Sequence, residues 1–231
     1  MLESMWPSDP GALIRLQENL AVLPMPAAVF DPTAPVGACF VCFSRSGEGP
    51  GAAGDPGWAS AALCEARLSP VVAVAAGLAG GPYSPGLLAM REGMLLEAAV
   101  RSLPRIPSVL LVDATGRDHP RRAGLALHLG AVLGIPTVGV THRPLLAAGN
   151  WPGESRGAVA PLHLAGATVG YWVRTRSGAR PLAAHAAWGT TPELAAEVVL
   201  AASGRARTAD PSRAAREAAR QARARGEAAA G

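Results

Sequence analysis

The chain has 231 residues, 49% of them hydrophobic, which is enough for a single domain with a real core, although only 4% are aromatic. The formal net charge is +4 and all 21 basic residues are arginine, a balance that suits a polyanionic partner. The sequence has no long uncharged apolar run, and its first ten residues lack the basic start of a signal peptide, so we expect a cytoplasmic protein without a membrane partner.

The first third of the chain predicts a helix followed by a strand meander. Apolar residues recur at helical spacing over residues 10–22. Residues 35–43, 58–66 and 68–78 have strand patterns, and a Gly- and Pro-rich loop at 44–57 separates the first two. If these strands pair in order, they form one side of a mixed sheet.

The middle of the chain alternates between helices and strands. Helices are expected at 87–103 and 119–134, and strands at 107–116 and 135–141. The strand at 107–116 has an acidic end, which is typical of a buried strand that opens onto a site. The alternation predicts an α/β layered fold.

The last third predicts an outer strand at 167–175, a further strand at 180–189 and a capped helix at 190–204. A final helix at 211–225 would align four arginines on one stripe, namely Arg213, Arg216, Arg220 and Arg223. A solvated or frayed tail fits the same pattern. We therefore divide the chain into a single domain at 1–207 and an Arg-rich helix or tail at 208–231.

Three cysteines, Cys39, Cys42 and Cys64, are too few and too irregular for a disulfide framework. The C-x-x-C at Cys39 and Cys42 would need a second pair of ligands to hold zinc, and the sequence has none. In a strand, residues three apart point to opposite faces. We interpret these residues as small thiols of a core strand.

Three motifs follow one another, PYSPGLLAMRE (82–92), LLVDATGRDHPRRAGLALHLG (110–130) and GIPTVGVTHRPL (134–145). They resemble the endonuclease V family, whose patterns are close to P-Y-x-P-G-x-L-x-F-R-E, V-D-G-x-G-x-x-H-P-R-R and P-T-I-G-V-A-K. The segment VGACFVCF is similar to the first strand of the family, A-G-x-D-V, and ADPSRAARE is similar to a family ending, P-E-P-T-R-x-A-D.

The resemblance implies a ribonuclease H-like mixed sheet flanked by helices. It also implies a nuclease that nicks DNA or RNA beside a deaminated base, chiefly hypoxanthine (inosine), with Mg²⁺ as cofactor. In such nucleases, carboxylates converge on metal ions that activate water and stabilise the leaving oxygen. Glu92 and Asp113 match the candidate catalytic and metal-binding carboxylates. Taken alone, Glu92 could be a solvated helix residue, and Asp113 could be a strand-end or helix-cap carboxylate.

Further matches concern nucleic-acid binding. Tyr83, held by Pro85 and Gly86, resembles a wedge that enters the duplex beside the damaged base, although the same segment alone could be a tight surface turn. Gly86 and Gly116 resemble glycines of the pocket for the flipped base, where the backbone approaches closely.

The H-P-R-R run supplies three further candidates, His119, Arg121 and Arg122. Pro120 would begin the helix at this point, and the three side chains could then meet a phosphate near the helix N-terminus.

Four positions depart from the family pattern. The first catalytic Asp falls at Cys39, the Lys of the third motif at His142, a late catalytic His at Thr190 and a Gly at Ala114. A thiol is a soft, weak ligand for Mg²⁺ and carries little charge near neutral pH. We therefore expect severely weakened metal binding in a degenerate member of the family, with His142 kept as a candidate catalytic position.

Three functions remain compatible with these substitutions. The chain could bind nucleic acid or a purine-like group without cutting it. It could be an active nuclease with a rebuilt site, using a substitute carboxylate or a softer metal such as Zn²⁺ or Mn²⁺ with Cys39, His119 or His142 as ligand. The candidate carboxylates are Asp31, Glu48, Glu65 and Asp118. The cleft could also serve a protein or small-molecule partner.

Overall fold

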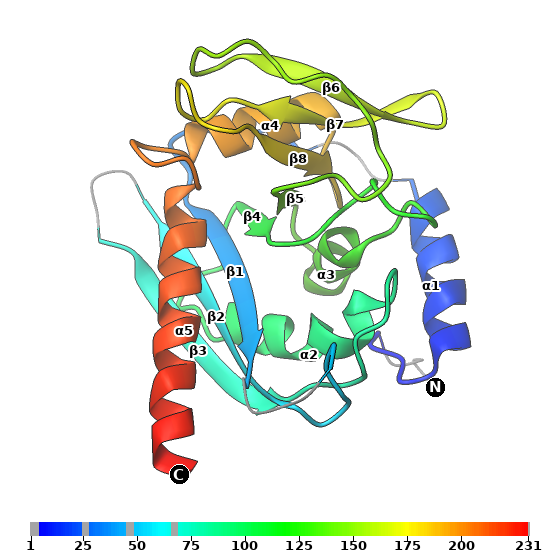
Figure 1. Cartoon of the computed structure of the whole chain (residues 1–231), viewed down its shortest axis with the longest axis vertical. Coiled ribbons are helices and arrows are strands. Elements are labelled where there is room, and N and C mark those ends of the chain that lie inside the picture. The colour runs from blue at the N-terminus through cyan, green and yellow to red at the C-terminus, as the bar shows by residue number, and fades with distance from the viewer. Residues whose placement is uncertain (1–4, 25–27, 45–48, 66–68, 231) are drawn as a thin grey trace.

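The computed structural model describes residues 5–24, 28–44, 49–65 and 69–230, which form one eight-stranded mixed sheet with helices on both faces (Figure 1). The strand order is β3-β2-β1-β4-β5-β8-β7-β6. The strands are β1 Val36–Phe43, β2 Pro56–Cys64, β3 Val71–Leu78, β4 Val109–Val112, β5 Thr137–Thr141, β6 Val159–Leu164, β7 Ala167–Val173 and β8 Leu182–Ala186. The helices are α1 Pro10–Val22, α2 Leu88–Arg101, α3 Leu125–Leu133, α4 Pro192–Ala201 and α5 Asp210–Ala230. The predicted α/β architecture is confirmed.

Strand pairing brings distant segments to one edge of the sheet. The predicted meander is confirmed, because β2 pairs antiparallel with both β1 and β3. Strands β1, β4 and β5 run parallel, so their carboxyl ends lie at the same edge. In this register Cys39 lies opposite Val112, the last residue of β4, and Asp113 follows at once.

The central strands are buried on both faces, as expected for parallel strands between helices. In β4, Leu110 and Val112 belong to a core with α1, α2 and α3, and Val109 and Leu111 belong to a second core with α4. Cys39 is buried in the first core as predicted, whereas Cys42 of the same strand is only half-buried, and no disulfide bond joins the three cysteines.

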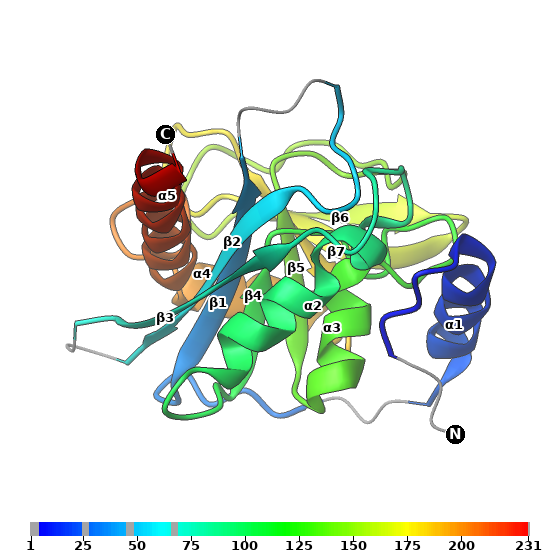
Figure 2. The same ribbon diagram turned by 90° about the horizontal axis from the view of Figure 1, so that it is seen from below.

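Helix α5 lies on the sheet face opposite α2 and contacts β1 and β2 (Figure 2). After Pro211, its buried side chains are alanines, Ala215, Ala219 and Ala222, which allow close approach to the strands. The Ser60 hydroxyl donates to the Ala215 carbonyl. The C-terminal arginines therefore belong to a packed helix, and in this part of the chain the alternative of a frayed tail is wrong.

Two sequence predictions need correction. Helix α3 begins at Leu125 and not at 119, because residues before it turn tightly and Arg122 has a positive φ of 57°. The segment at 167–175 was predicted as an outer strand, but β6 pairs with β7 and forms the edge. Strand β6 was not predicted from the sequence, because its pattern is interrupted by Pro161 and by a β-bulge at Leu162 and His163. Among the described residues, no helix meets the length and hydropathy needed to cross a bilayer.

The segment before α1 packs across the helices of the first core. The ring of Trp6 stacks on His128 of α3 with centroids 4.4 Å apart, and the indole donates to Glu97 of α2. His128 lies fully buried with its Nε2 2.6 Å from the Met5 carbonyl oxygen. Burial lowers the pKa of His128 to about 4.

The buried His128 predicts acid sensitivity. Because its pKa falls from 6.5 in the unfolded chain to about 4 in the folded protein, the unfolded state takes up the proton first. Its contribution to the free energy of unfolding is complete above pH about 6.5 and is lost as the pH falls toward about 4. Urea unfolding at a series of pH values should show the wild type losing about 2–3 kcal/mol more than His128→Gln over this range. Parallel pH profiles of the two proteins would contradict this assignment.

Candidate active site

Three residues from different elements line one small cavity at the carboxyl edge of the parallel strands. Cys39 comes from β1, Glu92 from α2 and Asp113 from the turn after β4. The cavity has a volume of about 90 Å³, and its remaining lining residues are Phe40, Val41 and Leu96. The structure thus brings together the two candidate carboxylates and the position where the family pattern has its first Asp.

The cavity holds little negative charge near neutral pH. Burial, reinforced by the nearby Asp113 carboxylate, raises the pKa of Glu92 to about 8, against an opposing effect of Arg91. Burial, with smaller effects of Asp113 and Glu92, raises the pKa of the Cys39 thiol well above its usual range. Glu92 is therefore mostly protonated and Cys39 is a neutral thiol in this state of the protein.

The third group, Asp113, is paired with an arginine. Arg216 of α5 donates from Nη2 to Oδ2 of Asp113 at 2.9 Å, and its guanidinium lies over the Phe40 ring, 5.1 Å from the centroid. Sequence reasoning placed Arg216 on a basic stripe but missed this contact. The signal was present in the tail match, since the final Asp of the P-E-P-T-R-x-A-D pattern falls at Arg216.

The residues present do not fit the Mg²⁺ ion that the family resemblance implies. Mg²⁺ needs several hard, charged oxygen ligands, and here one of the three positions is a neutral thiol and a second, Asp113, is already paired with Arg216. Among the described residues, no group of three or more His, Cys, Asp or Glu side chains is arranged to hold a metal ion.

None of the described substitute carboxylates lines this cavity. Asp118 is fully buried, and its oxygens accept backbone N–H groups of Leu145, Leu146 and Ala147 at 2.6–2.8 Å. Asp31 accepts from Thr33, and Glu65 pairs with Arg105. The fourth candidate, Glu48, lies outside the described residues.

Thr190, which was matched from the sequence to a late catalytic His of the family, lies at the edge of the sheet opposite the cavity. Its hydroxyl donates to the carbonyl of Thr137, the first residue of β5, and accepts from the Ala187 amide. Asp113 follows the opposite end of β4. The local match that placed the family His at Thr190 is therefore wrong in space, and Thr190 is a turn residue before α4.

His142 lies beside the candidate carboxylate. It lines a narrow crevice together with Asp113 and Arg216. Partial burial, followed by the charges of Arg207 and Arg216, lowers the pKa of His142, and Asp113 opposes this shift. His142 is therefore neutral at physiological pH, unlike the Lys of the family pattern. Ala114, the other departure, is buried in the core.

The turn that carries Tyr83 is fastened to the H-P-R-R run. Tyr83 is 48% exposed, and Gly86 has a φ of 77°, which favours glycine. The Gly86 carbonyl accepts from Arg121 at 2.7 Å and from Gln17 of α1 at 3.2 Å. His119 also donates to it from Nε2 at 3.1 Å, since its Nδ1 accepts the Arg121 amide. Burial lowers the pKa of His119 to about 4, so the ring is neutral.

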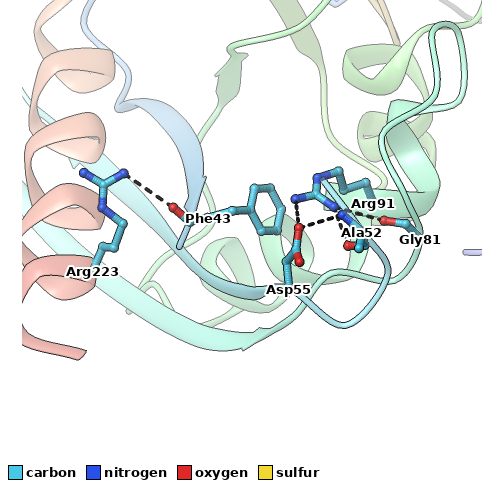
Figure 3. A network of polar contacts seen from close by, with 6 residues as sticks. All are labelled: Phe43, Ala52, Asp55, Gly81, Arg91 and Arg223. Carbon is cyan, nitrogen blue, oxygen red and sulfur yellow. Dashed lines mark hydrogen bonds and ion pairs between the residues drawn. The ribbon is translucent and has the colours of Figure 1, made fainter. Parts of the chain in front are cut away.

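Arg91, the neighbour of Glu92, anchors the other end of this turn (Figure 3). Its guanidinium pairs with Asp55 at 2.8 Å, donates to the carbonyls of Ala52 and Gly81, and lies 3.9 Å from the centroid of the Phe43 ring. One buried cation thus connects β1, the loop before β2 and the start of the Tyr83 turn.

The proposed phosphate contact at a helix N-terminus is not supported. The H-P-R-R run precedes α3 by several residues, Arg121 is bound to Gln17 and Gly86, and Arg122 donates to the Leu164 carbonyl. Gly116 packs against β8 so closely that a Cβ atom there would lie 2.1 Å from the Ala186 carbonyl oxygen. These residues hold the site together in this state, and their contact with nucleic acid stays a prediction.

Comparisons of the sequence and of the fold with known proteins point to one family. The sequence model of the Endonuclease V family matches residues 53–217. A curated Endonuclease V of Streptomyces avermitilis is 46% identical over 127 residues, covering 54% of this chain and 55% of that protein. In that alignment the chain spans about half the length of its relative.

Solved structures extend the likeness over nearly the whole chain. The crystal structure of an Endonuclease V from Streptomyces avermitilis matches with a TM-score of 0.82 and 32% identity, covering 94% of each chain. A Ciona intestinalis Endonuclease V in complex with a 24mer DNA containing an inosine has a TM-score of 0.71 at 18% identity, covers 91% of this chain and 96% of its own, and shows the fold alone. The predicted ribonuclease H-like class is confirmed.

The buried Asp118 generates a prediction on stability. Asp118→Ala leaves three backbone N–H groups near residue 146 without their acceptor and should lower the free energy of unfolding by about 3 kcal/mol. Asp31→Ala, which removes a carboxylate from an exposed loop, should cost about 1 kcal/mol or less. Denaturant unfolding of both variants makes the comparison, and equal losses would show that Asp118 is not the anchor of this loop.

Proposed function

The chain belongs to the endonuclease V family, and we propose that it binds nucleic-acid strands at the cleft of that family while having lost most or all of the ability to cut them. The proposed ligand is DNA or RNA that carries a deaminated base such as hypoxanthine. The family is generally metal-dependent, whereas this chain would act through binding.

The single observation that supports the loss of cutting is the thiol of Cys39 between Glu92 and Asp113. A divalent metal ion needs negative charge concentrated at this point, and a buried neutral thiol supplies none. Without the metal, water is not activated and the charge on the leaving oxygen is not stabilised. The ability to cut would therefore be lost because the metal ion no longer binds, while the fold is kept.

Retained binding is supported by the Tyr83 turn. An exposed aromatic ring on a turn fixed by Arg91 at one end and by Gly86 at the other can stack on a base without reorganisation of the protein. The structural neighbour from Ciona intestinalis was solved with inosine-containing DNA, and we carry that ligand class over to this chain as part of the proposal.

The first test is a nicking assay run together with a binding titration. Oligonucleotides with a single inosine, as DNA and as RNA, would be incubated with Mg²⁺ or Mn²⁺ and compared with matched strands that carry adenine. We expect inosine-dependent binding without nicking. A family member that retains the complete carboxylate set serves as the positive control for nicking.

Nicking that disappears in Glu92→Ala would overturn the proposal and would favour an active nuclease with a rebuilt metal site. If neither nicking nor binding occurred at low ionic strength, the cleft would instead serve a protein or small molecule.

The Tyr83 turn gives a second prediction. Tyr83→Ala removes the stacking ring and should weaken binding of the inosine strand by about 5- to 100-fold, equivalent to about 1–3 kcal/mol. The ring is half exposed, so thermal stability should change little. Tyr83→Phe keeps the ring and should bind like the wild type. If all three proteins bound equally in fluorescence anisotropy, Tyr83 would have no part in recognition.

A further inference from the structure

We propose that the guanidinium of Arg216 acts as a built-in cation of this site, which holds Asp113 and binds a phosphodiester group of the nucleic-acid strand without a divalent metal ion. This inference rests on the proposed function and names the group that would receive the strand. Its basis is the ion pair between a C-terminal helix and the turn after β4, 103 residues apart in the sequence.

The position of Arg216 is fixed by the packing of α5. Ala215, its neighbour, is buried against β2, where its carbonyl accepts from Ser60. The Arg216 guanidinium then lies over the Phe40 ring and reaches Oδ2 of Asp113, with 22% of its side chain exposed. Phe40 and Asp113 both line the cavity that contains Cys39 and Glu92. Arg216 itself lines the crevice that contains Asp113 and His142, so its positive charge lies beside Asp113 at the border of this cavity.

Arg216 has donors to spare for a second anion. A guanidinium carries five N–H groups in a planar fork, and the contact with Asp113 engages Nη2. The fork matches the geometry of two oxygens on one phosphate, which makes arginine a good phosphate ligand. A partly exposed guanidinium held in place by a carboxylate is pre-ordered for such a contact.

Several further arginines lie near Arg216, in addition to the one positive charge that pairs with Asp113. A shallow groove along α5 is lined by three arginines, Arg213, Arg216 and Arg220, and by one acidic residue, Glu217. The Arg220 guanidinium also lies 6.0 Å from the centroid of the Phe40 ring. On the other side, Arg207 and Arg216 both lower the pKa of His142. A strand that lies along this groove would pass Arg216, which also lines the crevice that contains Asp113 and His142.

The same charge disfavours a divalent ion. Arg216 already neutralises Asp113 at 2.9 Å, and a metal ion at that carboxylate would have to displace the guanidinium or lie against it. Removing Arg216 should therefore have opposite effects on two ligands, weakening the binding of the strand and strengthening the binding of the metal.

The experiment uses the full chain and a fluorescently labelled single strand with one inosine, followed by anisotropy in EDTA and again with Mg²⁺. Arg216→Gln removes the guanidinium. Arg213→Gln is the matched control, since it removes one equal charge from the same helix and groove, at a residue that pairs with Asp210 in place of Asp113. Arg216→Lys keeps the charge and loses the fork. Circular dichroism and thermal melting verify that each variant is folded.

We expect the wild type to bind equally in EDTA and in Mg²⁺. Arg216→Gln should weaken binding of the strand at least about tenfold and lower the salt dependence of binding by about one counterion. Arg213→Gln should weaken binding by no more than about threefold. The affinity of Arg216→Lys should lie between those of the two glutamine variants. Equal losses in the two glutamine variants, or binding that requires Mg²⁺, would overturn the inference and leave the proposed function standing. Absence of any binding by the wild type would overturn both.

A second readout is independent of the strand. Mn²⁺ titrated into each protein and followed by electron paramagnetic resonance should bind Arg216→Gln at least about tenfold more tightly than the wild type, because Asp113 is freed, while Arg213→Gln should resemble the wild type. Tight Mn²⁺ binding by the wild type would overturn the inference. Polyglutamate that competes with the strand as well as an unlabelled oligonucleotide does would also overturn it and would indicate an acidic protein partner.

Discussion

Hydrogen bonds between β1 and β4 set Cys39 opposite Val112, and the chemistry of this protein is arranged around that register. Because the two strands are parallel, Asp113 leaves β4 beside the middle of β1, where a cavity remains between the sheet and α2. Helix α2 then brings Glu92 to the same point from one face, and α5 brings Arg216 from the other face. Shifting the pairing by one residue would turn the Cys39 side chain into the opposite core.

The net charge of the site therefore depends on side chains that come from both faces of the sheet. On the α2 side, burial favours neutral forms of Cys39 and Glu92. On the α5 side, Asp113 forms an ion pair with Arg216. The result is a nuclease fold whose cavity has almost no net negative charge, although two of the carboxyl groups matched by the family pattern are still present. Function in such a scaffold is determined by the charge of a few side chains and not by the architecture.

Much of this arrangement could be predicted from the sequence. Strand and helix patterns located β1, β2, β3 and α2, because periodicity and glycine-rich turns are local signals. The two candidate carboxylates came from the resemblance of the long motifs to the endonuclease V family. The contact between Arg216 and Asp113 could not be predicted in the same way, because it depends on how α5 packs on strands that come from a distant part of the chain. The assignment of Thr190 failed for the related reason that a short local match carries no information about which edge of the sheet it reaches. The start of α3 was misplaced because Arg122 adopts a conformation that its residue type seldom takes.

The buried guanidinium of Arg91 connects the turn that carries Tyr83 to the helix that carries Glu92. Its contacts fasten Ala52, Asp55 and Gly81 to the first turns of α2, and Glu92 is the next residue of that helix. The turn that presents Tyr83 and the helix that carries Glu92 are therefore connected through one side chain. A displacement of this turn would be transmitted through Arg91 to the start of α2, so the stacking ring and the cavity would move together.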